Sequence, residues 1–420
     1  MIIEKSKINN RVNLCMVKTK KFKTDLIGIY IKRPLNSKEA AMNTLISRLM
    51  QRSTMSYPTT KSLNTHLEES YGMILVADVV KYGDYQILQV KLQFPNGNYL
   101  NEAIFESAID IMKEVVLHPN IKMEKFDDDY FNQEKAHLID EIQSRVNDKM
   151  SYSIERCIEC MYEGEAYANY VYGDVEDVKC ITNEMLYQHY KHIIETSKID
   201  ISVMGDIEFD HVNEVIETFG FNDYEVHPII SENHERLQVN EVKEKFNVKQ
   251  GKLVLGYDTP FTHLHELYEA SLLAYYILAG SPNSRLFKLL REDKGLCYYV
   301  FSKSDRFKGS MFLGAGIESE NYDLVLQLIA ETIADLQWSV TETEIELAKD
   351  AMIASIRSIS DFPNSFINFF YTEMLEKNKE YIFSLDQMME DFNNVTLASV
   401  QAVYQNLSLD TVYFIDGGKK

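Results

Sequence analysis

The sequence has few cysteines, a deficit of basic residues and no long apolar run. Five cysteines in a chain of 420 residues indicate a reducing compartment. Lysine and arginine number 43 against 64 aspartates and glutamates, and the net charge of −21 argues against nucleic-acid binding. No run of eighteen apolar residues occurs, so we expect no membrane span. The first fifteen residues, MIIEKSKINNRVNLC, lack the apolar core of a secretory signal, and these absences together predict a cytoplasmic protein.

The second part of the chain repeats the first at a fixed distance. With 45% hydrophobic residues in 420, the chain is long enough to bury two or more large cores. Two sets of residues recur 214 positions later. In the first set, Lys135, Ile139, Ile142 and Ser144 are matched by Lys349, Ile353, Ile356 and Ser358. In the second set, Thr182, Leu186 and Tyr190 are matched by Thr396, Val400 and Tyr404. Two matches at one offset argue for an internal duplication.

Hydrophobic periodicity predicts strands and helices in both parts. Expected strands are 12–18 and 24–33, joined as a hairpin, then 73–81, 84–94, 199–204 and 411–415; expected helices are 37–53 and 60–71. Residues 221–243 are polar without a sustained period, which is typical of a linker. We therefore predict an α+β fold of two similar halves, 1–220 and 244–420, with 221–243 as the linker between them. Each half is a mainly antiparallel sheet with helices packed on it.

One stretch, residues 284–309, combines an arginine and a tyrosine in a way that favours a binding site. Leu286, Leu289 and Leu290 share a helical face, and Gly295 is placed to end that helix. Alternation then predicts a strand, so Arg291 lies in the last helical turn and Tyr298 early in the strand. A guanidinium and a phenol so placed can hold a peptide carbonyl or an oxyanion. The alternative is an ordinary surface arginine beside a half-buried tyrosine.

The segment SRLFKLLREDKGLCYYV resembles the second-half signature of the pitrilysin/insulinase-type zinc peptidases, the inverzincins. The resemblance runs over nearly the whole chain, and Gly173 and Gly205 fall where that family has glycines. It implies two α/β halves that face each other, and two such two-half units that enclose a chamber. It also implies that Arg291 and Tyr298 assist binding and catalysis from the half opposite the zinc.

The zinc-binding motif of that family is missing. The sequence contains neither HxxEH nor HExxH. When helix 37–53 is aligned with the family on Ser53-Thr54, the two histidine positions hold Thr44 and Arg48, and the general-base position holds Ser47. A hydroxyl is a poor zinc ligand and a guanidinium does not deprotonate in proteins. The resemblance places the accessory and ligand glutamates at Glu134 and Glu141. We therefore predict a degenerate zinc site that binds no metal.

Removal of the metal leaves a carboxylate that needs a new partner. Burying an uncompensated carboxylate is costly, so we predict that Arg48 reaches Glu141 and replaces the charge of the cation. The alternative is that Arg48 points to solvent and the site is abandoned.

Other candidate groups are explained more simply. His189 and His192 with Glu195, and His263 with His265 and Glu266, match no hydrolase pattern and fit exposed helix histidines. The lone Cys157-x-x-Cys160 motif fits helix packing better than metal or redox chemistry, since no second pair accompanies it.

These observations predict the non-catalytic subunit of a two-chain zinc peptidase for peptide processing or degradation. Arg291 and Tyr298 would serve a partner chain that carries HxxEH and the zinc, in a heterodimer, or else the chain forms a homodimer. The runner-up is a peptide-binding scaffold or regulator without a role in cleavage, for example one tied to elongation factor P modification, as the resemblance implies. A self-sufficient peptidase with an unconventional site is the third option.

Overall fold

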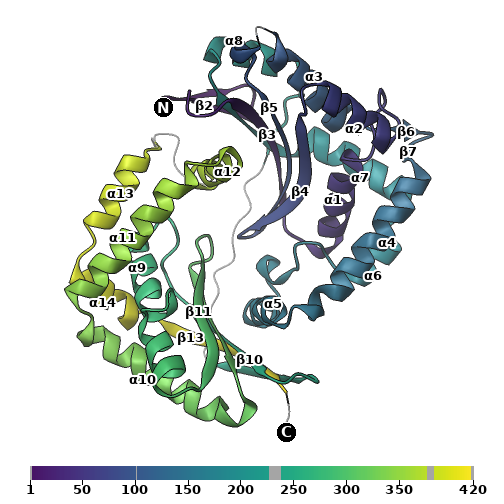
Figure 1. The fold of residues 1–420 in the computed structure, drawn as a ribbon. Helices are drawn as coiled ribbons and strands as arrows, with labels where there is room; N and C mark the ends of the chain where they lie inside the picture. The colour runs from purple at the N-terminus through teal and green to yellow at the C-terminus, as the bar shows by residue number, and fades with distance from the viewer. Residues whose placement is uncertain (1, 101, 227–237, 376–382, 418–420) are drawn as a thin grey trace. The chain divides into compact units, whose positions relative to one another are not determined.

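The computed structural model describes residues 2–100, 102–226, 238–375 and 383–417. The chain forms two compact units, each composed of three segments. Unit 1 contains the described residues within Met1–Ser144, Asn169–Ser231 and Ser360–Glu376; unit 2 contains those within Arg145–Ala168, Glu232–Ile359 and Lys377–Lys420. Both units combine a mainly antiparallel sheet with helices (Figure 1), so the predicted α+β class is confirmed.

Unit 1 is built on a six-stranded sheet in the order β1-β2-β8-β3-β5-β4. Its strands are β1 (Ile2–Lys7), β2 (Val12–Lys18), β3 (Thr24–Pro34), β4 (Ile74–Tyr82), β5 (Tyr85–Pro95) and β8 (Lys198–Gly205). Its helices are α1 (Ser37–Met50), α2 (Thr60–Glu69), α3 (Ile104–Leu117), α4 (Asp128–Ser144), α6 (Val175–Cys180), α7 (Asn183–Thr196), α8 (Phe209–Glu217) and α12 (Pro363–Met374). A short hairpin, β6 (Ile121–Lys122) and β7 (Lys125–Phe126), stands apart from this sheet.

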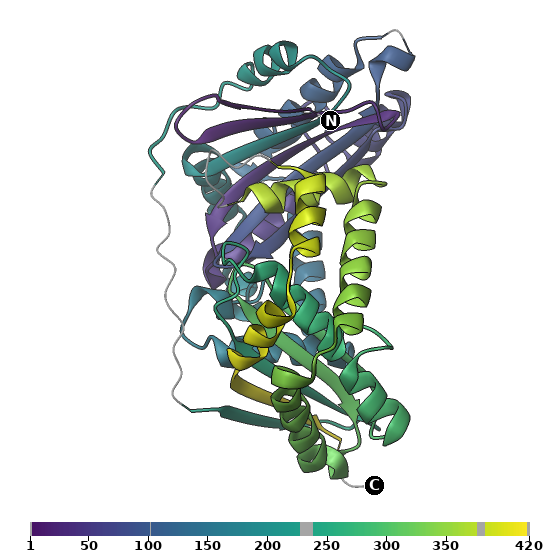
Figure 2. The ribbon, with the colours of Figure 1, turned by 90° about the vertical axis from the view of Figure 1, so that its left-hand side faces the viewer.

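Unit 2 is built on a five-stranded sheet in the order β11-β12-β10-β13-β9. Its strands are β9 (Asn240–Lys245), β10 (Gly251–Asp258), β11 (Cys297–Asp305), β12 (Ser310–Ile317) and β13 (Ser408–Asp416). Its helices are α5 (Lys149–Met161), α9 (Tyr268–Ala279), α10 (Tyr322–Ser339), α11 (Glu342–Ile359), α13 (Leu385–Asn393) and α14 (Leu397–Gln405), of which α9, α10, α11 and α14 pack on one another as a layer (Figures 1 and 2). A π-helical segment, η4 (Phe287–Asp293), precedes β11.

The strand orders of the two sheets show the duplication in space. Read from the opposite edge, the second sheet runs β9-β13-β10-β12-β11, which matches β2-β8-β3-β5-β4 of unit 1. In each sheet a single pair is parallel, β2 with β8 and β9 with β13. The helices keep the offset seen in the sequence, because α4 and α11, α5 and α12, and α7 and α14 begin 214 residues apart. The predicted internal repeat is therefore confirmed within the described residues.

Two helices are exchanged between the halves of the sequence: α12, from the second half, packs in unit 1, and α5, from the first half, packs in unit 2. Helix α12 lies against β3 and β8 of unit 1, where Tyr371 stacks on Tyr30 with ring centroids 3.8 Å apart. Helix α5 lies on β10 and β13 of unit 2, close enough that a Cβ at Gly256 would lie 2.9 Å from Sδ of Met161. A side chain at Gly256 would displace the Met161 thioether, so glycine lets the side chains of α5 pack closely on β10. Cys157, from the CxxC motif, is buried at the same contact, as predicted.

Three sequence-based expectations need correction. The compact units do not coincide with 1–220 and 244–420, because the segments around α5 and α12 are exchanged. Part of the predicted linker, 227–237, lies outside the described residues, and its C-terminal end is wrong because Asn240–Lys245 forms β9. The predicted hairpin is also wrong, since β8 lies between β2 and β3 and pairs with both. All three errors concern long-range pairing, which local periodicity does not encode.

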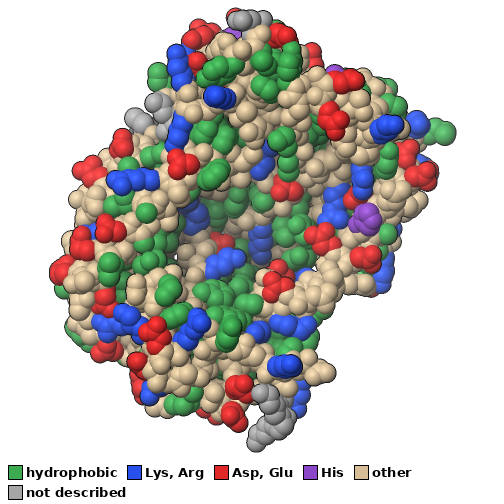
Figure 3. All heavy atoms as spheres, viewed as in Figure 1, with side chains coloured by type: hydrophobic (Ala, Val, Ile, Leu, Met, Phe, Trp, Pro, Cys, Tyr) green, Lys and Arg blue, Asp and Glu red, His purple; other side chains and the backbone are tan. Residues whose placement is uncertain are grey.

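The surface is mixed in charge. On the face drawn in Figure 3, acidic and basic side chains are interspersed. The net charge of −21 is therefore not gathered into a single acidic field on that face, which fits a role in solubility. Among the described residues, none of the helices combines the length and apolarity needed to cross a bilayer.

Candidate functional site

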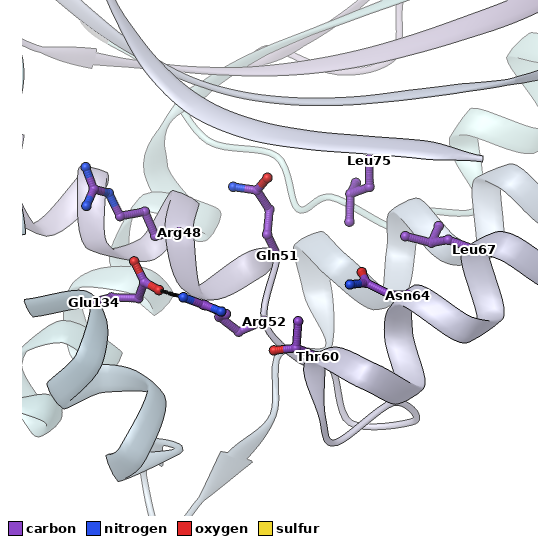
Figure 4. A pocket seen from close by; sticks show the side chains of 8 residues that line it. All are labelled: Arg48, Gln51, Arg52, Thr60, Asn64, Leu67, Leu75 and Glu134. Carbon is purple, nitrogen blue, oxygen red and sulfur yellow. Dashed lines mark hydrogen bonds and ion pairs between the residues drawn. The ribbon is translucent and has the colours of Figure 1, made fainter. Parts of the chain in front are cut away.

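The end of α1 presents three polar side chains to a pocket of about 300 Å³ in unit 1 (Figure 4). Asn36 caps the start of α1 by accepting from the backbone N–H of Glu39, which sets where the helix begins. Arg48, in the last turn, and Gln51 and Arg52, just beyond it, line the pocket. The remaining lining residues are Thr60, Asn64 and Leu67 of α2, Leu75 of β4 and Glu134 of α4.

Arg52 binds the buried glutamate of this pocket. Its Nε donates to Oε1 of Glu134 at 2.7 Å, and its terminal nitrogen contacts the same oxygen. The Glu134 side chain is only 6% exposed, so it depends on this guanidinium for the compensation of its charge. The sequence assigned Glu134 to the site but gave it no partner.

Arg48 and Glu141 form the ion pair expected from the sequence. The guanidinium of Arg48 contacts Oε2 of Glu141, and its centre lies 5.8 Å from the ring of Tyr172. The prediction that Arg48 reaches Glu141 is confirmed. The Glu141 side chain is 46% exposed, however, so the pair lies at the rim and is screened by solvent. Two arginines at and just beyond the end of α1 are therefore matched by two glutamates two turns apart on α4.

Thr44 and Ser47 take no part in the pocket. Both are buried; the Thr44 hydroxyl donates to the carbonyl of Ala40, and the Ser47 hydroxyl donates to the carbonyl of Thr44. Their assignment to the former zinc site stays a prediction, and the residues that line the pocket follow one helical turn later. Arg48, Gln51 and Arg52 stand at the spacing of the two histidines and the glutamate in HxxEH, and they are the residues that line the pocket. The segment RLMQR carries the sequence signal for this pocket. Its three polar residues are Arg48, Gln51 and Arg52, and the two apolar residues between them, Leu49 and Met50, are buried.

Gln51 makes a hydrogen bond that a glutamate cannot make. Its Nε2 donates to the backbone carbonyl of Ala77 in β4 at 2.6 Å, and Figure 4 shows the side chain reaching toward the strand that carries Leu75. An ionised carboxylate only accepts hydrogen bonds, so glutamate at this position would face the carbonyl with two acceptors. Because β4 is an edge strand, this bond also caps one of its backbone acceptors.

The residues of the pocket do not fit zinc. Zinc needs neutral histidine nitrogens, thiolates or carboxylates, whereas two guanidiniums and only one carboxylate line this pocket. In the described part of the chain, no group of three or more histidine, cysteine, aspartate or glutamate side chains is placed to hold a metal. The histidine pairs noted in the sequence likewise form no such group. His189 is buried and its Nε2 lies 2.8 Å from Oδ1 of Asn43, which is a structural contact.

The second candidate pair lies in unit 2. Arg291 is carried by the π-helical η4 and Tyr298 by β11, with Gly295 between them at φ +61. A glycine there ends the helix because the left-handed conformation costs it little. The guanidinium centre of Arg291 lies 5.6 Å from the ring of Tyr298 and 4.8 Å from that of Phe287. Tyr298 is 70% exposed. The expected convergence of the two side chains is confirmed, while their role at a partner's site stays a prediction.

Comparisons with known proteins agree with this geometry. A family profile described as "Peptidase M16 inactive domain" matches residues 181–352. A Bacillus subtilis protein described as "Probable inactive metalloprotease YmfF" is 30% identical over 407 residues, which are 96% of this chain and 95% of that protein. This chain belongs to the M16 peptidase family. The pitrilysin-type resemblance is thereby confirmed.

Two solved structures share the fold. A conserved protein from Enterococcus faecalis V583 superposes with a TM-score of 0.94 at 26% identity, covering 100% of this chain and 99% of that one. The peptidase M16 inactive domain from Pseudomonas fluorescens gives a TM-score of 0.83 at 16% identity, with 100% and 99% covered.

Two of the comparisons describe an inactive protein. The family profile and the Bacillus subtilis relative are both described as inactive. They agree with the expectation that this chain is a peptidase-like protein that is not catalytic alone.

Proposed function

We propose that this M16 chain is the non-catalytic subunit of a two-chain zinc peptidase, whose partner carries HxxEH and the zinc. The observation that carries the proposal is a contrast between two sites. Arg48 and Arg52 bring two guanidiniums to the pocket at the end of α1, whereas Arg291 and Tyr298 converge as an exposed pair. If this chain had no part in peptide cleavage, the arrangement of Arg291 and Tyr298 would serve no purpose. The pair therefore favours a role beside a partner's active site.

The chemistry of the proposed role follows from the exposed pair. A guanidinium and a phenol are donors that hold a peptide carbonyl and stabilise the oxyanion formed when water attacks it. Stabilisation of this kind depends on where the donors lie and not on which chain supplies them. The partner supplies the zinc and the general base, and this chain supplies donors and binding surface.

Reconstitution tests the proposal. The chain is mixed with an HxxEH-bearing homologue of similar length from the same organism, and cleavage of a fluorogenic peptide is measured. We expect activity from the pair and none from this chain alone. Arg291→Ala should lower the rate of the pair by about 10²-fold or more, the scale for losing one oxyanion donor.

Lys288→Ala provides the matched control. Lys288 is a second exposed cation on η4, and no contact with Tyr298 is present. An equal loss of rate in both variants, or no loss in either, would contradict the assigned role of Arg291. Size-exclusion chromatography of the mixture distinguishes a heterodimer from a homodimer of this chain.

Peptide binding without cleavage is the second candidate function, and the edge strand β4 favours it. Ile74 and Val76 are 57% and 42% exposed on this strand, which carries unpaired backbone groups at its outer side. An extended peptide that adds to such an edge gains backbone hydrogen bonds and apolar contacts. Binding of peptides to the isolated chain, with no activity in any reconstituted pair, would support this function over the first.

A further inference from the structure

We infer that the pocket formed by Arg48, Gln51 and Arg52 binds a carboxylate, supplied by the C-terminus of a peptide that lies along β4. The inference rests on the proposal that this chain takes peptides at β4. It assigns a ligand class to a pocket whose residues no longer fit a metal. Its support comes from the charges, the free donors and the blocked strand edge at the pocket.

The pocket wall carries two guanidiniums that keep unused N–H donors. Two guanidiniums line it, whereas Glu134 is the one carboxylate among its eight lining residues. Glu141 pairs with Arg48 from the half-exposed rim and does not line the pocket. A guanidinium has five N–H groups, of which Arg52 uses two on Glu134 and Arg48 uses one on Glu141. Donors therefore remain for an anionic ligand.

Helix α2 adds neutral donors. The hydroxyl of Thr60 is buried and has no hydrogen-bond partner among the described residues. Thr60 and Asn64 are one helical turn apart and both line the pocket at the start of α2, where the helix dipole favours negative charge (Figure 4). Together with the guanidiniums they match the oxygens of a carboxylate, which forms its strongest hydrogen bonds with charged donors.

The edge strand β4 explains why the C-terminus of a bound peptide fits this pocket better than an internal segment of a peptide does. Leu75 of β4 lines the pocket, and two residues further along the carbonyl of Ala77 is occupied by Nε2 of Gln51 at 2.6 Å. A peptide strand that pairs with β4 cannot donate a backbone hydrogen bond to the Ala77 carbonyl, because Gln51 already does so. A peptide that stops there places its terminal carboxylate beside the pocket, while Leu67 and Leu75 offer an apolar wall to its last side chain.

The test measures binding of three fluorescent peptides of one neutral sequence to the full chain by anisotropy. One has a free C-terminus, one is C-terminally amidated, and one is amidated with a single glutamate near its end. We expect the free acid to bind about tenfold or more tightly than the amide, and the preference to fall with added salt. A preference for the glutamate peptide over both others would assign the pocket to acidic side chains and overturn the C-terminal assignment.

Paired substitutions test whether the pocket causes the preference for the free acid, and they leave no buried charge without a partner. Arg52→Gln with Glu134→Gln removes both partners of one pair at nearly equal volume, and thermal melting verifies the fold. We expect it to abolish the preference for the free acid. Arg33→Gln with Glu39→Gln is the matched control, because that pair involves α1 but lies outside the pocket. Equal binding of acid and amide overturns the carboxylate site but leaves peptide binding at β4 intact. Absence of binding by all three peptides overturns both, while the subunit role is judged separately by reconstitution.

Discussion

Arg52 donates from Nε to Oε1 of Glu134 at 2.7 Å, and it links the end of α1 to a glutamate of α4 that solvent hardly reaches. A second ion pair, Arg48 with Glu141, joins the same two parts of the chain. The two pairs differ in burial, because the Glu134 side chain is 6% exposed and the Glu141 side chain is 46% exposed, and this difference has measurable consequences.

The first prediction compares the two arginines. Arg52→Ala removes the guanidinium from the buried Glu134 and leaves only His137, 3.9 Å away, near its carboxylate, and we expect a loss of about 2–4 kcal/mol in the free energy of unfolding. Arg48→Ala leaves Glu141 half-exposed to water, and we expect a loss of about 0.5–1 kcal/mol. Urea denaturation followed by circular dichroism measures both. Equal losses, or a larger loss for Arg48→Ala, would show that burial of the glutamates does not set the strength of the pairs.

The second prediction concerns metal binding. The natural chain should hold no stoichiometric zinc, because two guanidiniums and only one carboxylate line the pocket. The triple variant Arg48→His, Gln51→Glu and Arg52→His restores the donor set, and we expect it to bind about one zinc ion per chain with Glu141 as the third ligand. Metal analysis after dialysis gives the stoichiometry, and Glu141→Gln in the same background should weaken zinc binding.

A control variant tests the position of the site along α1. Thr44→His, Ser47→Glu and Arg48→His place the same motif one turn earlier, where Thr44 and Ser47 are buried and away from the pocket. We expect no zinc binding from this variant. Zinc bound by the earlier motif and not by the later one would contradict the register derived from the structure.

The third prediction isolates the hydrogen bond of Gln51. Gln51→Met removes the donor to Ala77 and should cost about 1 kcal/mol of stability. Gln51→Glu should cost more at neutral pH, because an ionised carboxylate faces the carbonyl with no proton to donate. As pH falls through the carboxyl pKa the introduced group becomes a donor, so its extra cost should disappear. Stability curves that remain parallel for the two variants from pH 7 to pH 4 would rule out this contact.

The fourth prediction follows from the burial of His189. Burial lowers the pKa of His189 to about 4 from an ordinary value of 6.5, with further lowering by Arg33 and His192 and opposition from Glu39. Between about pH 6.5 and pH 4 the unfolded chain is therefore protonated at His189, whereas the folded chain is not. Neutral His189 therefore costs the folded chain no stability above about pH 6.5. As pH falls from 6.5 toward 4, the free energy of unfolding decreases progressively, because only the unfolded chain takes up the proton.

His189→Gln tests the size of that decrease. The amide can keep a hydrogen bond with Asn43 but does not titrate in this range. Subtracting the pH dependence of the variant from that of the natural chain should leave a loss of about 2–3 kcal/mol between pH 6.5 and pH 4. A difference curve that is flat over this interval would mean that His189 takes up its proton equally in the folded and the unfolded chain.

Much of the local structure was determined by the sequence. Periodicity placed the start of α1 at residue 37, alternation marked β4 and β5, and Gly295 marked the end of the helix that carries Arg291. These signals act over a few residues, through caps, turns and side-chain periods, so a single segment contains them. The duplication was visible for a similar reason, because equivalent helices keep equivalent patterns at an offset of 214.

The register of the pocket was decided only by the tertiary structure. A helical face repeats every three to four residues, so Thr44 with Ser47 and Arg48 with Gln51 are almost equivalent by periodicity alone. Which turn of α1 meets Glu134 depends on how far the helix extends along α4, and that is fixed by packing between segments some 80 residues apart. The exchange of α5 and α12 and the insertion of β8 between β2 and β3 have the same origin. Each depends on which distant surfaces bury the most apolar area together, and no local pattern specifies that choice.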